Sequence, residues 1–139
     1  MKLRVVKALG EIALRVADLD AMQAFYEEVI GLELMRQFPS SAFFKIADGY
    51  KGHTQILALF DRSHQEGYKG IDASRTTIDH LAFAISLNDY ESELKRLQGL
   101  GQTVTTTTHG WVKWRSLYVR DPEGNQVELV CYDSAIDES

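Results

Sequence analysis

The chain has 139 residues, of which 45% are apolar and 25% charged, a balance typical of one folded globular domain over residues 1–139. Its net charge of -5, with acidic residues spread along the chain, excludes the basic stripe that nucleic-acid binding needs. The single cysteine, Cys131, excludes an intrachain disulfide, and no apolar run reaches the ~20 residues of a membrane span. We therefore expect a cytoplasmic protein that binds neither nucleic acid nor membrane.

The first half of the sequence predicts one helix and four strands. The helix is predicted over 19–30, with Asp18 as its cap and Gly31 at its end. Its apolar stripe, at helical spacing, consists of Leu19, Met22, Tyr26 and Val29/Ile30. Strands are predicted over 11–16, 32–38, 42–47 and 54–60.

The second half repeats this order after a polar connection over about 61–77. Its helix is predicted to begin at Asn88, with Glu91 three residues later as the partner in a capping box. Its apolar stripe consists of Tyr90, Leu94 and Leu97. Its strands are predicted over 80–85, 103–108, 114–119 and 126–131.

The two halves align along their length, which indicates an internal duplication. Glu11 aligns with His80 at an offset of 69 residues, and Ala58 aligns with Glu128 at an offset of 70. This period is too long for a solenoid repeat. We therefore predict an α+β fold of two tandem βαβββ modules, over about 9–60 and 78–132, whose eight strands form a cup-shaped mixed sheet.

The strand residues separate into two chemically different faces, because successive side chains of a strand point to opposite sides. The large aliphatic side chains share one face and are expected to pack under the helices. The other face carries small alanines together with the ionisable residues Glu11, His80 and Glu128. An unpaired buried carboxylate is costly, so this second face is expected to line a pocket rather than a core.

Three segments carry a resemblance to a known superfamily. They are residues 11–19 (EIALRVADL, followed by Phe25-Tyr26 and Ile30-Gly31-Leu32), residues 78–83 (IDHLAF) and residues 118–130 (YVRDPEGNQVELV). These segments resemble the two half-openings and the closing motif of the vicinal oxygen chelate superfamily, which includes glyoxalases, bleomycin-resistance proteins and extradiol dioxygenases. The resemblance covers nearly the whole chain.

The resemblance also implies a metal site. In this superfamily the ligands come from the first and fourth strands of each half, which correspond here to Glu11, Ala58, His80 and Glu128. Ala58 has no donor atom, so three ligands remain, with Glu11 at a position where histidine is usual. Two carboxylates and one imidazole suit Mn²⁺, Fe²⁺, Ni²⁺, Co²⁺ or Zn²⁺. Glu128 and Glu11 are also candidates for moving a proton.

Other residues are weaker candidates. Lys45, Arg15 and Tyr118 share the pocket face by alternation and are predicted to contact substrate, although each has the alternative of extending into solvent. His53 and Gln55 lie near Ala58 but would reach the pocket face only through a bulge. His109, Trp111 and Trp114 are predicted to lie at the rim of the pocket. There they would cover a ligand or contact a second subunit. His64 and Cys131 carry no functional signal.

Three functions are compatible with this pattern. The first is a metal-dependent lyase, isomerase or dioxygenase acting on a small substrate with vicinal oxygens. The second is a metal-free binding protein that sequesters a small molecule, as bleomycin-resistance proteins do. The third is an inactive interaction domain. The resemblance favours a homodimer, because paired modules cover exposed sheet edges. The predicted ligands, which sequestering members lack, favour the enzyme.

Overall fold

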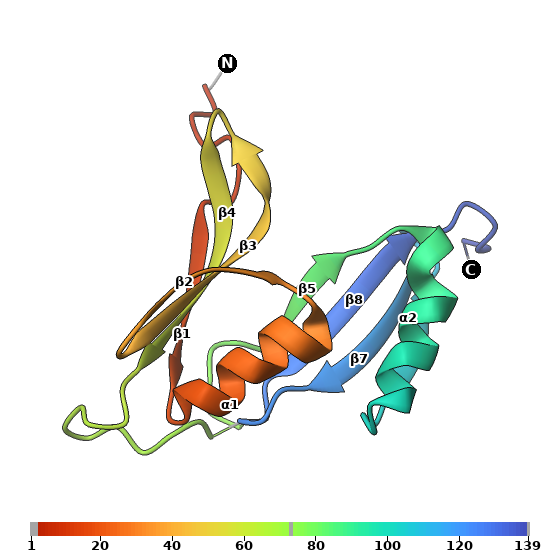
Figure 1. Cartoon of the computed structure of the whole chain (residues 1–139). Helices are drawn as coiled ribbons and strands as arrows, with labels where there is room; N and C mark the ends of the chain where they lie inside the picture. Colours follow the sequence, from red (N-terminus) through yellow and green to blue (C-terminus); the bar gives the residue numbers. More distant parts are fainter. Residues whose placement is uncertain (1–2, 73, 139) are drawn as a thin grey trace. The chain divides into compact units, whose positions relative to one another are not determined.

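A computed structural model describes residues 3–72 and 74–138 (Figure 1). Contacts divide the chain into two compact units, Met1–Gly70, called unit 1, and Ile71–Ser139, called unit 2. Each unit has the order strand, helix, three strands, so the predicted α+β fold of two tandem βαβββ modules is confirmed. The eight strands form two four-stranded mixed sheets, one in each unit. That the two units make up a single domain stays a prediction.

Unit 1 contains a sheet in which the first and last strands are neighbours. Strand β1 pairs in parallel with β4, β4 pairs antiparallel with β3, and β3 pairs antiparallel with β2. The elements are β1 (Glu11–Val16), α1 (Leu19–Ala24), the π-helical segment η1 (Phe25–Ile30), β2 (Glu33–Phe38), β3 (Ser41–Tyr50) and β4 (His53–Asp61).

The helix of unit 1 begins and ends where the sequence predicts. The Asp18 side chain accepts a hydrogen bond of 3.1 Å from the Ala21 N–H, which caps the first turn. After Ala24 the winding widens to a π-helix, and the helix ends at Gly31, whose φ of 88° lies in the left-handed region that favours glycine. Tyr26 and Ile30, which are four residues apart in this segment, are both buried.

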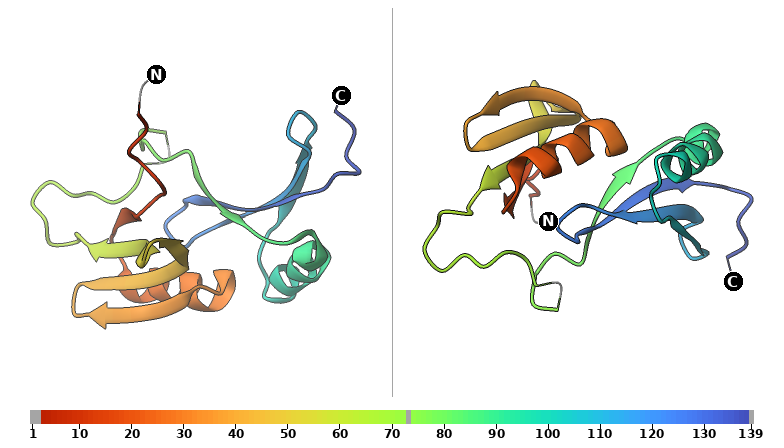
Figure 2. Two further views of the ribbon diagram at one scale, coloured as in Figure 1. Left: turned by 90° about the horizontal axis from the view of Figure 1, so that it is seen from above. Right: turned by 60° about the horizontal axis from the view of Figure 1, so that its bottom comes forward.

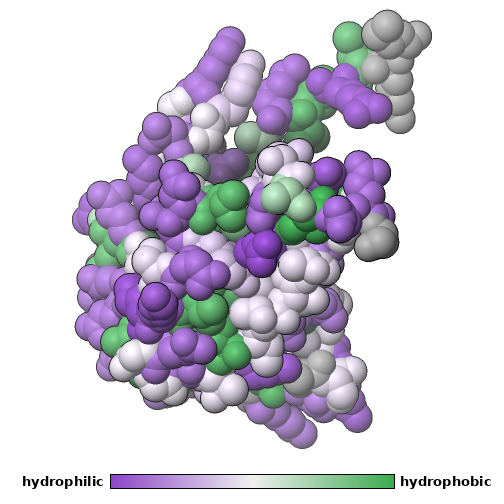
Figure 3. All heavy atoms as spheres, turned by 90° about the vertical axis from the view of Figure 1, so that its right-hand side faces the viewer, coloured by the Kyte–Doolittle hydropathy of each residue, from purple (hydrophilic) through white to green (hydrophobic). Residues whose placement is uncertain are grey.

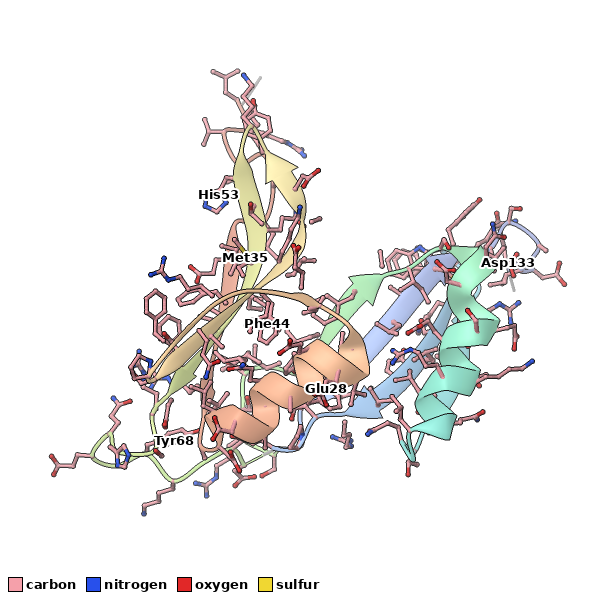
Figure 4. The ribbon with its side chains drawn as sticks, in the orientation of Figure 1. Glu28, Met35, Phe44, His53, Tyr68 and Asp133 are labelled. Atoms are coloured by element: carbon pink, nitrogen blue, oxygen red, sulfur yellow. The ribbon has the colours of Figure 1, made fainter. Side chains whose placement is uncertain are left out.

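The core of unit 1 lies between the sheet and this helix. Side chains alternate along β1, where Leu14 and Val16 are buried and Glu11, Ala13 and Arg15 are exposed. Phe44 points from β3 toward α1 (Figure 4), and its ring centroid lies 6.4 Å from that of Tyr26. The opposite side of the sheet carries no helix. We call it the open face of unit 1.

Unit 2 repeats this sheet. Strand β5 pairs in parallel with β8, β8 antiparallel with β7, and β7 antiparallel with β6. The elements are β5 (His80–Ala84), α2 (Leu87–Gly99), β6 (Thr105–His109), β7 (Trp114–Arg120) and β8 (Gln126–Tyr132). Leu81 and Phe83 are buried, whereas His80, Ala82 and Ala84 are exposed on the open face of unit 2, the side without a helix.

The predicted start of the second helix is wrong by two residues. The N-cap is Ser86, not Asn88, which lies inside α2. The Ser86 hydroxyl donates a 2.8 Å hydrogen bond to the Asp89 carboxylate, and the Asp89 N–H donates to the Ser86 carbonyl. A serine three residues before an acidic residue is itself a helix-start pattern, and here it overrides Asn88 and Glu91. Tyr90 and Leu97 form the buried stripe, while Leu94 is half-buried.

A turn with defined hydrogen bonds leads into the last strand. The Asp121 carboxylate accepts from the backbone N–H groups of Glu123 and Asn125 and from the Asn125 side chain, at 2.8–3.0 Å. Gly124 takes a φ of 93°, which a residue with a Cβ rarely adopts. The turn fixes where β8 begins and therefore which residues of β8 pair with which residues of β5 and β7.

Each helix covers one face of the sheet of its own unit (Figure 2). No helix within the described ranges is long and apolar enough to cross a membrane. On the face seen in Figure 3, apolar residues occur in small patches that polar residues separate.

Candidate functional site

The parallel pairing of β5 with β8 brings His80 and Glu128 together. Ala82 lies opposite Glu128, and His80 lies opposite Gln126, so both ionisable side chains point to the open face of unit 2. The His80 Nε2 atom is 3.1 Å from Glu128 Oε1. The sequence predicts this pair, and the structure places the two donor atoms side by side.

Asp79 orients the imidazole from the other side. Its Oδ2 atom lies 2.7 Å from His80 Nδ1. A neutral imidazole carries one N–H, and when that N–H donates to Asp79 the Nε2 lone pair faces the Glu128 carboxylate. Two acceptors at this distance repel each other unless a proton or a cation lies between them. A carboxylate on the far nitrogen of a histidine is also the usual arrangement around metal-ligating histidines.

Glu128 is a buried carboxylate with named partners. It is 5% exposed, and its Oε2 atom accepts a 2.5 Å hydrogen bond from the Ser116 hydroxyl. Since Ser116 occupies Oε2, the carboxylate presents Oε1 toward His80. Burial of a charge is tolerated only when it is paired and hydrogen-bonded, and these contacts supply such partners.

Tyr118 adds a hydroxyl group to the same surface. It lies directly opposite Glu128 in the β7–β8 register, and its hydroxyl is 3.1 Å from His109 Nε2. Its ring meets the His80 ring edge-on, with centroids 6.5 Å apart. Burial raises the pKa of Tyr118, the neighbouring Glu128 charge raises it further, and Ser116 opposes the shift. Tyr118 therefore stays protonated and can donate a hydrogen bond.

The predicted residues of unit 1 lie on its open face. Glu11 pairs with Ile56, and Ala58 is fully buried between Ala13 of β1 and Phe43 of β3. Lys45 forms a 2.8 Å ion pair with Asp48, and this pairing raises the pKa of Lys45. Both side chains are exposed, so Lys45 can leave Asp48 and bind a ligand instead.

Arg15 lines a hollow of about 400 Å³ at the end of β1, together with Asp61, Arg62, His64 and Gln65. His64, which carries no signal in the sequence, therefore borders a cavity. His53 lies at the start of β4 (Figure 4), with its Nδ1 2.9 Å from the Thr54 carbonyl oxygen. The β3–β4 pairing has two register shifts near it, between Lys45 and Ala47 and between Ala47 and Tyr50, and in both the extra residue lies in β3 rather than in β4.

Over residues 3–72 and 74–138, no group of three or more His, Cys, Asp or Glu side chains is close enough to hold a metal ion. His80 and Glu128 form a pair of donors in unit 2. The donor set of this pair fits a divalent cation: one imidazole nitrogen, one carboxylate oxygen, and a second carboxylate on the far nitrogen. Glu11, in unit 1, stays a predicted third ligand.

Sequence reasoning missed two residues of this site. Asp79 directly precedes His80, and Ser116 lies two residues before Tyr118 on the same face of β7. The alternation of side chains along a strand predicts which face of the sheet Ser116 lies on. Its contact with Glu128 depends on the register between β7 and β8, which this alternation does not predict. The contact of His109 with Tyr118 depends in the same way on the β6–β7 pairing, in which His109 faces Trp114.

Comparison with known proteins agrees with this architecture. The sequence profile of the Glyoxalase/Bleomycin resistance protein/Dioxygenase superfamily matches residues 8–129. The chain belongs to this superfamily. The resemblance seen in the three sequence segments is thereby confirmed.

Relatives within the superfamily have different activities. The chain is 24% identical over 125 residues to a protein named glutathione transferase FosA from Serratia marcescens, covering 90% of this chain and 81% of that one. A solved lactoylglutathione lyase from Agrobacterium tumefaciens is 28% identical with a TM-score of 0.66, covering 92% and 96%. A solved glyoxalase/dioxygenase from Nostoc punctiforme, 22% identical with a TM-score of 0.70 over 96% and 100%, shows the fold alone.

Proposed function

We propose that the chain is a divalent-metal-dependent enzyme that acts, as a glyoxalase-like lyase or isomerase or as a dioxygenase, on a small substrate with two neighbouring oxygens. The observation that carries this proposal is the His80–Glu128 pair, with Nε2 and Oε1 3.1 Å apart and Asp79 on Nδ1. Membership of a superfamily that includes lyases and dioxygenases supports it. Mn²⁺, Fe²⁺, Ni²⁺, Co²⁺ and Zn²⁺ all accept this donor set.

His80 and Glu128 would hold the metal ion, with Glu11 as the third ligand. When bound, the ion would supply a positive charge that stabilises a developing oxyanion. Ser116 keeps Oε2 of Glu128 engaged, so Glu128 presents only Oε1. Tyr118 would donate a hydrogen bond from its hydroxyl group to a substrate oxygen, while Lys45 and Arg15 would neutralise substrate charge. Glu11 or Glu128 would accept the proton that the substrate loses.

A homodimer is part of the same proposal. Each sheet has two edge strands, β1 and β2 in unit 1 and β5 and β6 in unit 2, and exposed edges favour pairing with another chain. A second copy of the chain would cover such an edge. Sedimentation velocity over a range of concentrations tests this, and a monomer mass at all of them would contradict it.

The metal proposal is tested by measuring bound metal in the purified protein and titrating the metal-free protein with Mn²⁺, Ni²⁺ and Zn²⁺ by calorimetry. His80→Ala should weaken binding about 100-fold or more, because it removes the only nitrogen ligand of the proposed site. Glu11→Gln should weaken binding less, because an amide oxygen still ligates. Binding should also weaken in acid, because an imidazole must be neutral to ligate.

His64→Ala provides the matched control, since His64 is exposed and lies in unit 1 outside the donor pair. Equal divalent-metal affinity for the wild type and for His80→Ala would contradict the proposal. The second candidate, a metal-free small-molecule binding protein, would then be the better account. That candidate is favoured by Ala58, which occupies the Glu128-equivalent place in unit 1 and is packed against Phe43.

A further inference from the structure

Three phenylalanines form a row on the open face of unit 1. Phe43 lies opposite Ala58, while Phe38 and Phe60 lie on either side of Ser41, so all three share one face. The Phe43 centroid is 5.9 Å from that of Phe38 and 5.7 Å from that of Phe60, and both contacts are edge-to-face. This geometry is favourable for aromatic rings, so the row is an ordered surface rather than a chance grouping.

The row is accessible from outside unit 1. Phe38 is 41% exposed, and Phe43 and Phe60 are half-buried. Of its small neighbours in the sheet, Ala13 is exposed and Ala58 is fully buried. A flat apolar group placed there would gain contact with the ring edges and with the Ala13 methyl group.

A guanidinium lies at each end of the row. The Arg36 Cζ atom is 4.9 Å from the Phe38 centroid, and the Arg62 Cζ atom is 5.1 Å from the Phe60 centroid. Within the described ranges no carboxylate pairs with either guanidinium. Arg96 and Arg115 differ from them, since these bind Glu93 and Asp133 at 2.8 and 2.9 Å.

Arg62 also connects the row to the hollow that Arg15 lines. Arg15, like Arg62, has no carboxylate partner in the part of the chain that the structure describes. The one carboxylate in the hollow, Asp61, accepts two hydrogen bonds from Ser63 to its Oδ1, and these lower its pKa. Two guanidiniums therefore face a space in which a single carboxylate is already engaged.

We propose that unit 1 binds an aromatic carboxylate through this face, with the ring against Phe43 and Phe60 and the carboxylate between Arg62 and Arg15. The ring gains apolar and edge-to-face contacts, and the carboxylate gains the partner that both guanidiniums lack. Such a ligand would be the substrate of the proposed enzyme, and that assignment rests on the proposed function. Binding itself requires no metal.

Calorimetry on the full-length, metal-free protein tests the proposal with three probes: naphthoate, the uncharged naphthylmethanol and the non-aromatic cyclohexanecarboxylate. Naphthoate should bind about tenfold or more tightly than either of the others, because only naphthoate offers both the ring and the charge. Arg62→Gln should weaken naphthoate binding about fivefold and leave naphthylmethanol unchanged. Phe43→Leu should weaken both naphthyl probes.

Arg75→Gln is the matched control, because Arg75 lies in unit 2, is exposed and pairs with Asp72. Its naphthoate affinity should equal that of the wild type. Equal affinity for naphthoate and naphthylmethanol, or an unchanged naphthoate affinity in Arg62→Gln, would overturn the proposal. Because no metal is present, a failure here is separate from a failure of the His80→Ala test, which measures metal binding alone.

Discussion

Ala58 in unit 1 and Glu128 in unit 2 occupy the same place in two sheets with the same strand order. Their neighbours correspond as well: Phe43 faces Ala58 as Tyr118 faces Glu128, and Ser41 corresponds to Ser116 in the register. The open face of unit 1 is consequently aromatic around this point, and that of unit 2 is polar. The comparison shows that the duplicated fold supplies positions, whereas a few side chains on adjacent strands decide whether a position holds a charge.

The largest expected effect comes from giving unit 1 the carboxylate of unit 2. Ala58→Glu would place a charge at a fully buried position beside Phe43, where Ser41 corresponds to Ser116 but the residue that corresponds to His80 is Glu11, a second carboxylate. The free energy of unfolding should fall by about 3 kcal/mol, as measured by urea denaturation of the metal-free protein. Ala13→Glu, on the neighbouring strand and exposed, should cost less than about 0.5 kcal/mol. Equal costs would contradict the contrast between the units.

The next effect tests the support of the buried charge in unit 2. Ser116→Ala removes the hydroxyl that donates to Glu128 Oε2 and should cost about 2 kcal/mol in urea denaturation, because the carboxylate loses a partner. Ser41→Ala is the equivalent change in unit 1, where Phe43 and Ala58 offer no acceptor, and it should cost less than about 0.5 kcal/mol. A neutral Ser116→Ala would show that water replaces the hydroxyl and that Ser116 does not position Glu128.

A smaller effect separates the helix starts of the two units. Asp18→Ala should lower the free energy of unfolding by about 1 kcal/mol, because the Ala21 N–H loses its acceptor. Ser86→Ala should cost only a few tenths of a kcal/mol, because the Ser86 hydroxyl bonds the Asp89 side chain rather than a backbone N–H. Thermal denaturation of the two variants under one set of conditions gives the comparison, and the reverse order would contradict it.

The smallest effect is a pH dependence to which two tyrosines of unit 2 contribute. Burial raises the pKa of both Tyr118 and Tyr90 in the folded protein. The resulting stabilisation is present below the ordinary tyrosine pKa and is lost as pH rises through the higher folded value, because the unfolded chain releases its protons first. Tyr118→Phe should flatten the fall of stability in alkali, measured by urea denaturation across that range. Tyr132→Phe, at an exposed position, should leave the fall unchanged.

Much of the fold was predictable because the alternation of apolar and polar residues and the residues that cap helices are local signals in the sequence. The bounds of β1 and of the first helix follow from alternation, Asp18 and Gly31. The start of α2 was not, because Ser86 and Asn88 both suit a cap and the hydrogen bonds between Ser86 and Asp89 favour Ser86. The pairing of His80 with Glu128 was predictable from the duplication. The contacts of Ser116, Asp79 and His109 were not, since they depend on strand register and rotamers.

The pairing of the first strand with the last has a consequence for synthesis on the ribosome. In unit 1, β1 cannot pair until β4 has been synthesised, because Glu11 pairs with Ile56. In unit 2, β5 cannot pair until β8 has been synthesised, because His80 pairs with Gln126. Neither sheet completes until its final strand leaves the exit tunnel, because loop closure precedes the gain from pairing. Unit 1 therefore completes its sheet while unit 2 is still being translated, and the two homologous halves are separated in time as they fold.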